Sequence, residues 1–225
     1  MSGHGPSLPE GRYAALLFDM DGTVLNSIAA AERIWSAWAT RHGLDVAAFL
    51  PTIHGARAVD TIGRLALPGV DPESEAEGIT MAEIDDVEGI VEVPGAAHFL
   101  RSLPAANWAI VTSAPKALAI QRMKAAGIPV PAVLVTSEDV AVGKPNPDCY
   151  LLAAKRLEVD IADCLIFEDA PVGIAAGDAA GAPVLVVTST HNHPMDTPHA
   201  TIKNYERIVA KADQGGFIQL GDRGI

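Results

Sequence analysis

Short apolar runs and longer amphipathic stretches alternate between residues 94 and 187. The apolar runs predict strands at 108–111, 133–135, 165–167 and 184–187, and the amphipathic stretches predict helices at 96–103, 116–126, 147–157 and 171–180. Strands separated by helices indicate a parallel sheet with right-handed crossovers. An earlier apolar run, 14–18, predicts one more buried strand of the same sheet.

The segment that follows this first strand has helical periodicity. One apolar stripe, spaced i, i+3, i+4 and i+7, consists of Ala31, Ile34, Trp35 and Trp38. A second helix is expected at 56–67. Because these helices interrupt the sheet, we expect a three-layer, Rossmann-like α/β core formed by residues 1–24 and 94–225, with an all-helical cap inserted at 25–93 and hinged near its ends.

Two aspartates follow the first strand directly, as Asp19 and Asp21, and Gly22 then allows a sharp turn. Alternate residues of an extended chain point the same way, so both carboxylates can face one space above the strand end. That edge of an open α/β sheet is where ligands bind. The two carboxylates would repel each other unless a cation or a shared proton lay between them, and Mg²⁺ prefers oxygen ligands.

Further polar residues follow the later strands. Thr112 and Ser113 end the strand at 108–111, where a hydroxyl and backbone N–H groups can bind phosphate oxygens. Lys144 offers a cation that would offset phosphate charge. Taken singly, Thr112 could be a helix cap and Lys144 an exposed loop lysine. Their occurrence together with acids at neighbouring strand ends favours a shared site.

The order Asp19-x-Asp21-Gly22-Thr23, Thr112, Lys144 and Glu168-Asp169 resembles the haloacid dehalogenase superfamily over nearly the whole chain. The resemblance implies that Asp19 is a nucleophile forming an aspartyl-phosphate and that Asp21 is the general acid and base. It also implies a magnesium ion held by the Asp19 carboxylate, the Asp21 backbone carbonyl and Asp169. Glu168 is expected to act through a bound water or behind the metal ligands.

Several reactions occur in this superfamily, and single residues separate them. Dehalogenases of this fold lack the second aspartate, so Asp21 argues against dehalogenation. Phosphonate hydrolysis uses a cap lysine, but no lysine precedes Lys116. Phosphomonoester hydrolysis and phosphosugar mutase chemistry remain, and a mutase would need the cap to hold a second phosphate, which Arg57 could do.

A closer similarity favours hydrolysis. His54-Gly55-x-Arg57, Val93-Pro94-Gly95-Ala96 and 108–113 look like microbial sugar phosphatases that act on hexitol phosphates and 2-deoxyglucose 6-phosphate. We therefore expect a Mg²⁺-dependent phosphatase of small phosphorylated sugars or polyols, with His54 and Arg57 contacting the substrate. The alternatives are a phosphosugar mutase, a glycerol-phosphate phosphatase, whose relatives share His54-Gly55, Arg57 and 167–171, and a catalytically silent binding module.

The composition of the chain indicates which classes of partner and which cellular compartment to expect. The net charge of −12 argues against nucleic acid, which binds through Lys and Arg. No apolar run is long enough to cross a membrane. Cys149 and Cys164 are expected to be buried free thiols in a reducing cytoplasm. We expect a cytoplasmic monomer or weak oligomer, with residues 1–12 forming a loose tail.

Four smaller features carry structural expectations. Asn26 stands where many relatives carry aspartate, and we expect it to cap a helix. The acidic run at 71–92 predicts a solvated helix face. His191-Asn192-His193 predicts a solvated loop rather than a metal site, and the glycines at 173, 177 and 181 predict close helix-to-sheet packing. The roles of Glu32, Trp35 and Trp38 at the pocket stay open.

Overall fold

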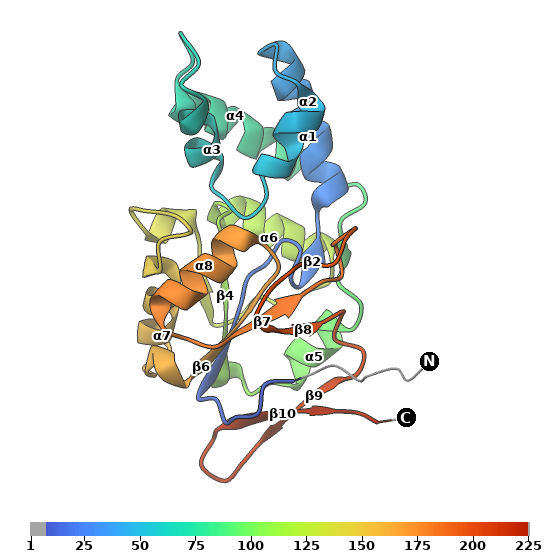
Figure 1. The fold of residues 1–225 in the computed structure, drawn as a ribbon, viewed down its shortest axis with the longest axis vertical. Coiled ribbons are helices and arrows are strands. Elements are labelled where there is room, and N and C mark those ends of the chain that lie inside the picture. Colours follow the sequence, from blue (N-terminus) through green and yellow to red (C-terminus); the bar gives the residue numbers. More distant parts are fainter. Residues whose placement is uncertain (1–7, 225) are drawn as a thin grey trace.

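The centre of the molecule is a six-stranded sheet in the order β5-β4-β1-β6-β7-β8, seen in a computed structural model that describes residues 8–224 (Figure 1). Every pairing within it is parallel, as the sequence predicts. Its strands are β1 (Ala15–Phe18), β4 (Trp108–Val111), β5 (Val133–Val135), β6 (Cys164–Glu168), β7 (Val184–Val187) and β8 (Ala200–Ile202). Strand β1 lies between β4 and β6, so the residues that follow it emerge at the middle of the sheet edge.

Helices cover both faces of the sheet, which gives the expected three layers. They are α5 (Ala96–Ser102), α6 (Lys116–Ala125), α7 (Asp148–Arg156) and α8 (Pro171–Ala180). Side chains alternate along β1, so Phe18 packs on the side of α5 and α6, while Leu17 packs against residues of α7 and α8. Both faces of β1 are fully buried.

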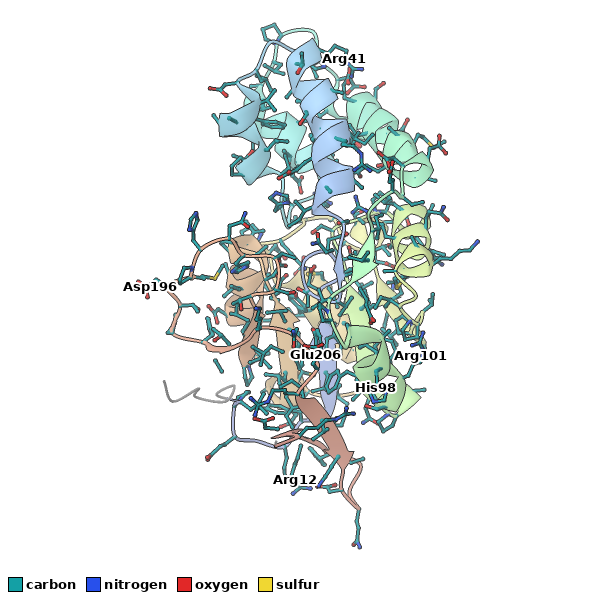
Figure 2. All side chains as sticks on the ribbon, turned by 90° about the vertical axis from the view of Figure 1, so that its right-hand side faces the viewer. Arg12, Arg41, His98, Arg101, Asp196 and Glu206 are labelled. Carbon is teal, nitrogen blue, oxygen red and sulfur yellow. The ribbon has the colours of Figure 1, made fainter. Side chains whose placement is uncertain are left out.

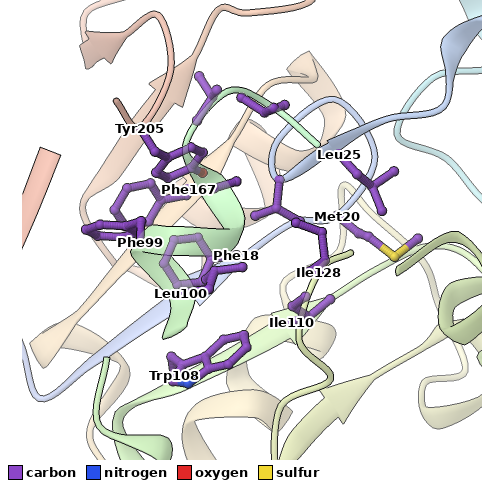
Figure 3. Packing of buried hydrophobic residues seen from close by; sticks show 14 of the residues in the cluster. Phe18, Met20, Leu25, Phe99, Leu100, Trp108, Ile110, Ile128, Phe167 and Tyr205 are labelled. Carbon is purple, nitrogen blue, oxygen red and sulfur yellow. The ribbon is translucent and has the colours of Figure 1, made fainter. Parts of the chain in front are cut away.

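An aromatic cluster packs on the α5 side of the sheet (Figure 3). The rings of Phe18 and Phe167 stack with centroids 4.4 Å apart, and Phe99 and Trp108 meet Phe18 edge-on at 6.2 and 6.3 Å. Phe18 and Phe167 directly precede two of the acidic residues that the sequence singles out. Their packing therefore holds the ends of β1 and β6 in register.

A helical segment, residues 28–85, stands above the carboxyl edge of the sheet (Figure 1). It comprises α1 (Ile28–Arg41), α2 (Val46–Phe49), α3 (Ala58–Leu65) and α4 (Pro72–Asp85), and a short antiparallel pair, β2 (Leu25–Asn26) and β3 (Val91–Glu92), joins it to the sheet. The Asn26 side chain accepts a hydrogen bond from the Ile28 N–H at 3.0 Å and so satisfies the first backbone donor of α1, although the N-cap position itself is Ser27, whose side chain makes no capping hydrogen bond. The division of the chain at residues 25 and 93 stays a prediction.

This helical segment has a hydrophobic cluster of its own. Trp35 and Trp38 are buried in it, with ring centroids 5.7 Å apart, and Phe49 packs against both. The apolar stripe that the sequence predicts on α1 is thus buried within the segment. Arg41 marks its end farthest from the sheet (Figure 2).

The C-terminal part contains elements that the sequence does not predict. Besides β8, a hairpin of β9 (Ile208–Ala212) and β10 (Ile218–Asp222) lies at the end opposite the helical segment, where Tyr13 bridges to Ile218 (Figure 1). Of the expected tail, 8–12 carry no helix or strand and 1–7 lie outside the described residues. Single 3₁₀ turns occur at η1 (Leu50–Thr52), η2 (Ala105–Asn107), η3 (Ser137–Asp139) and η4 (Ile161–Asp163).

Two compositional expectations can be compared with the structure. Cys149 and Cys164 are free and buried, as predicted. Within residues 8–224, no helix combines the length and the apolar character that crossing a bilayer requires.

The aromatic cluster should dominate the stability of the core. We expect Phe99→Ala to lower the free energy of unfolding by about 3–5 kcal/mol, because it removes a buried ring and leaves a cavity. His98 is exposed on the same helix, so His98→Ala should cost less than about 0.5 kcal/mol. Urea unfolding measures both, and equal losses would contradict the assignment of the cluster.

Candidate active site

The turn after β1 places Asp19 next to the turn after β6. Gly22 has φ +91°, and a Cβ there would lie 2.0 Å from Asp169 Oδ2, so only glycine allows this approach. Thr23 Oγ1 donates a hydrogen bond to Asp169 Oδ1 at 3.2 Å. Both Asp19 and Asp169 are buried. The two strand ends thus converge as the sequence predicts.

Lys144 lies between two of the acids. Its Nζ is 2.6 Å from Asp19 Oδ1 and 2.7 Å from Glu168 Oε1, and its side chain is 1% exposed. The exposed-loop alternative for this lysine therefore does not apply. A third hydrogen bond reaches the Val111 carbonyl at 3.3 Å, so Lys144 connects the ends of β1, β4 and β6.

Both carboxylate oxygens of Glu168 accept hydrogen bonds. Tyr150 donates its hydroxyl to Oε1 at 2.9 Å, while the N–H groups of Asp169 and Ala170 donate to Oε2 at 2.9 and 3.0 Å. A Cβ on Gly173 would lie 1.6 Å from Oε1, so the glycine allows α8 to pack closely against this carboxylate. Glu168 thereby fixes Lys144 in place. The sequence gives no sign of Tyr150, whose partner is 18 residues away.

The acids carry more negative charge than Lys144 neutralises. Oxygen atoms of Asp19, Glu168 and Asp169 all lie within 4.8 Å of one another. Burial and the nearby Glu168 raise the pKa of Asp19 to about 7, and the same causes raise the pKa of Asp169 well above its ordinary value. Burial alone would lower the pKa of Lys144, but Asp19 and Glu168 raise it. Three oxygen donors with uncompensated charge can hold a cation.

The Asp21 carboxylate belongs to a different set of contacts. Ser27 Oγ donates to its Oδ1 at 2.5 Å, and Arg122 Nη1 lies 3.1 Å from its Oδ2. Arg122 Nη2 also pairs with Glu83 Oε1 at 3.0 Å. The sequence assigns no role to Arg122. The sequence also predicts that the acidic run at 71–92 forms a solvated helix face. This prediction is wrong at Glu83, which is buried because Arg122 supplies a counter-charge.

A cavity of about 700 Å³ lies between the sheet edge and the helical segment. The sheet side contributes polar residues, among them Asp19, Asp21, Thr112, Ser113 and Asp169, and the helical side contributes Glu32, Trp35, His54 and Glu83. Trp35 therefore forms part of the cavity wall. Trp38 instead donates its indole N–H to Glu75 at 2.8 Å.

The residues predicted to bind phosphate and substrate differ in their surroundings. Thr112 Oγ1 accepts from the Ala114 N–H at 3.0 Å, and Ser113 Oγ donates to the Gly55 carbonyl at 2.9 Å. Both also face the cavity. Their roles toward phosphate stay predictions.

His54 and Arg57, the two residues of the helical segment that are predicted to contact the substrate, lie in different surroundings. His54 lines the cavity 3.7 Å from Glu32, and burial lowers its pKa. Arg57 forms a bidentate pair with Asp60 at 2.6 and 2.8 Å and donates to the carbonyls of Val140 and Ala141. It borders a smaller crevice beside Lys144 instead of the main cavity.

The histidine loop contacts the site as well. His191 Nε2 lies 2.9 Å from the Asp169 carbonyl oxygen, and His191 and His193 both line the cavity. Within residues 8–224, only Asp19, Glu168 and Asp169 form a group of three potential metal ligands, so these histidines form none. His191 is half-buried against the site, whereas Asn192 and His193 are exposed, so the loop is solvated as expected except at His191.

Known proteins that are similar to this chain include hydrolases, and several of them are phosphatases. A family model described as haloacid dehalogenase-like hydrolase matches residues 13–181. Hexitol phosphatase A of Escherichia coli is 42% identical over 83% of this chain and 87% of its own length, and 2-deoxyglucose-6-phosphate phosphatase 2 of Saccharomyces cerevisiae is 32% identical over 82% and 84%. The crystal structure of a hydrolase from Pseudomonas syringae has a TM-score of 0.69 at 27% identity, covering 79% of this chain and 85% of its own.

Close packing at Gly173 can be tested by adding a methyl group. Gly173→Ala should destabilise the fold by about 2–4 kcal/mol, because the Glu168 carboxylate must move and its hydrogen bonds are then lost. Gly78 lies within α4, and a methyl group added there would meet no neighbouring atom within 4 Å, so Gly78→Ala should be neutral or slightly stabilising. Urea midpoints compare the two, and a tolerated Gly173→Ala would contradict the contact.

Proposed function

The chain belongs to the haloacid dehalogenase-like hydrolases, and from this membership we propose that it hydrolyses phosphate monoesters of small sugars or polyols. The observation that carries the proposal is the convergence of Asp19 and Asp169 at the floor of one cavity, with the buried Lys144 paired to Asp19 directly behind them. The names of the two relatives, hexitol phosphatase and 2-deoxyglucose-6-phosphate phosphatase, indicate the substrate class.

The proposed reaction uses two aspartates in turn. The Asp19 carboxylate attacks phosphorus, the bond to the leaving oxygen breaks, and Asp21 gives that oxygen a proton. Asp21 then takes a proton from water, which attacks the aspartyl-phosphate and releases phosphate. Lys144, Thr112 and Ser113 offset or bind the phosphoryl charge. Asp19 is well suited to this role because Lys144 fixes one of its oxygens.

We propose Mg²⁺ as the cofactor, held by Asp19, Asp169 and the Asp21 backbone carbonyl. Asp19 and Asp169 fit this role, because their hard carboxylate oxygens lie within 4.8 Å of each other at a site where Lys144 is the paired cation. When bound, the ion supplies positive charge toward the transferring phosphoryl group. Glu168 already has both oxygens engaged, which supports its place behind the ligands.

The walls of the cavity favour hydrolysis over the mutase alternative. A mutase needs a free cation on the helical side for a second phosphate, but the guanidinium of Arg57 is occupied by Asp60 and backbone carbonyls. Glu32 and His54 offer partners for hydroxyl groups, and Trp35 offers an apolar surface. These features suit a neutral polyhydroxylated chain beneath a helical cap. The buried free thiols also support a cytoplasmic location, and we propose a monomer or weak oligomer.

A substrate panel tests the proposed reaction. With Mg²⁺ present, we expect phosphate release from hexitol phosphates, hexose 6-phosphates or 2-deoxyglucose 6-phosphate, with kcat/KM well above that for nucleotides. Glycerol phosphates in the panel test that alternative. Asp19→Asn should lower kcat at least about 10³-fold while the protein stays folded. A flat panel would favour a silent binding module, and a requirement for a sugar bisphosphate without phosphate release would favour a mutase.

Metal binding should stabilise the protein in a pH-dependent way. The pKa of Asp19 rises from 3.8 to about 7 on folding without metal, so this carboxyl stabilises the fold at low pH and loses that contribution as pH rises through about 7. Mg²⁺ binds the ionised form. At ~100 times its Kd it should raise Tm by about 5–10 °C near pH 8 and by much less near pH 5. The same Tm shift in Asp169→Asn would contradict the assigned ligands.

A further inference from the structure

Arg122 is a buried arginine between the sheet and the helical segment. It lies on α6, its side chain is 7% exposed, and it faces Asp21 from the turn after β1 and Glu83 from α4. Removing a guanidinium from water is costly unless carboxylates compensate it. Here two carboxylates do so, at 3.1 and 3.0 Å. Both raise the pKa of Arg122 against the effect of burial, so it stays charged.

These contacts determine how the Asp21 carboxylate is oriented. One oxygen accepts from Ser27 and the other pairs with Arg122, so neither the rotation nor the position of the group is free. A residue that exchanges protons with substrate must lie within hydrogen-bond reach of the reacting oxygen. Whatever fixes the carboxylate therefore affects the rate of proton transfer.

Arg122 itself depends on Glu83. Arg122 Nε has no hydrogen-bond partner among the described residues, so the two ion pairs alone orient the guanidinium. Glu83 is 9% exposed and comes from the helical segment, whereas Arg122 comes from the sheet layer. The orientation of Asp21 is thus tied to the placement of α4 on α6.

We propose that Arg122 is a positioning residue that holds Asp21 for proton transfer to the leaving oxygen, and that Glu83 holds Arg122 from the helical segment. The inference rests on the proposed function, because the acid role of Asp21 is part of it. It adds a residue from α6 and one from α4 to the machinery that the motifs describe.

Leaving-group dependence tests the proposal. A sugar alkoxide needs a proton as its bond to phosphorus breaks, whereas p-nitrophenolate leaves without one. Arg122→Gln should therefore lower kcat/KM for the best sugar phosphate about 10–100-fold, and for p-nitrophenyl phosphate less than about threefold. The ratio kcat/KM is used because it reports the step that expels the leaving group and not the later attack by water.

Four further variants make the test specific. Asp21→Asn should show the same selective loss, and adding Arg122→Gln to it should cost no more, since both act through one carboxylate. Glu83→Gln should show a smaller selective loss, and it also provides the test should Arg122→Gln fail to fold. Arg207→Gln is the matched control, because it breaks an exposed pair with Asp222 in the C-terminal hairpin and should leave both substrates unchanged.

The outcomes separate the inference from the proposed function. Equal losses on both substrates, or additive losses in the double variant, would indicate a general structural role and overturn the inference. Unchanged kinetics in both Arg122→Gln and Glu83→Gln would also overturn the inference. The proposed function would still stand in that case, provided that the wild-type protein hydrolyses a sugar phosphate. If the wild-type protein released no phosphate from any sugar phosphate, the proposed function would fail, and the inference with it.

Discussion

The ammonium group of Lys144 is the interaction on which the site depends. It is buried between Asp19 and Glu168, at 2.6 and 2.7 Å, and so joins the ends of two neighbouring strands. Without it, three carboxylates would face one another at the sheet edge with no fixed counter-charge. Tyr150 and two backbone N–H groups in turn hold Glu168, so the lysine is oriented from behind.

Much of the sheet and of the position of the acidic residues could be predicted, because both depend on local sequence patterns. Continuous apolar runs predict β1, β4, β6 and β7. Because these strands are parallel, Asp19 and Asp169 come to the same edge of the sheet. The sequence does not predict strands β8 to β10, because they are short and partly exposed. The family membership expected from the motifs is confirmed.

Contacts between distant side chains could not be predicted in this way. Arg122 lies on a helix whose residues show little separation of polar from apolar, and its partners come from two other elements. Glu83 belongs to a run of acids that looks uniform in the sequence, yet it alone of that run pairs with Arg122. Tyr150 likewise resembles any buried helix residue until Glu168 is placed beside it.

The distribution of tryptophans has a practical consequence for spectroscopy. Two of the three, Trp35 and Trp38, lie in the cluster of the helical segment, and the third, Trp108, packs beside Phe18 in the sheet layer. Replacing Trp108 by phenylalanine would leave tryptophan fluorescence that reports on the helical segment alone. Trp35 also borders the cavity, so its emission would register a molecule entering there, without any attached dye.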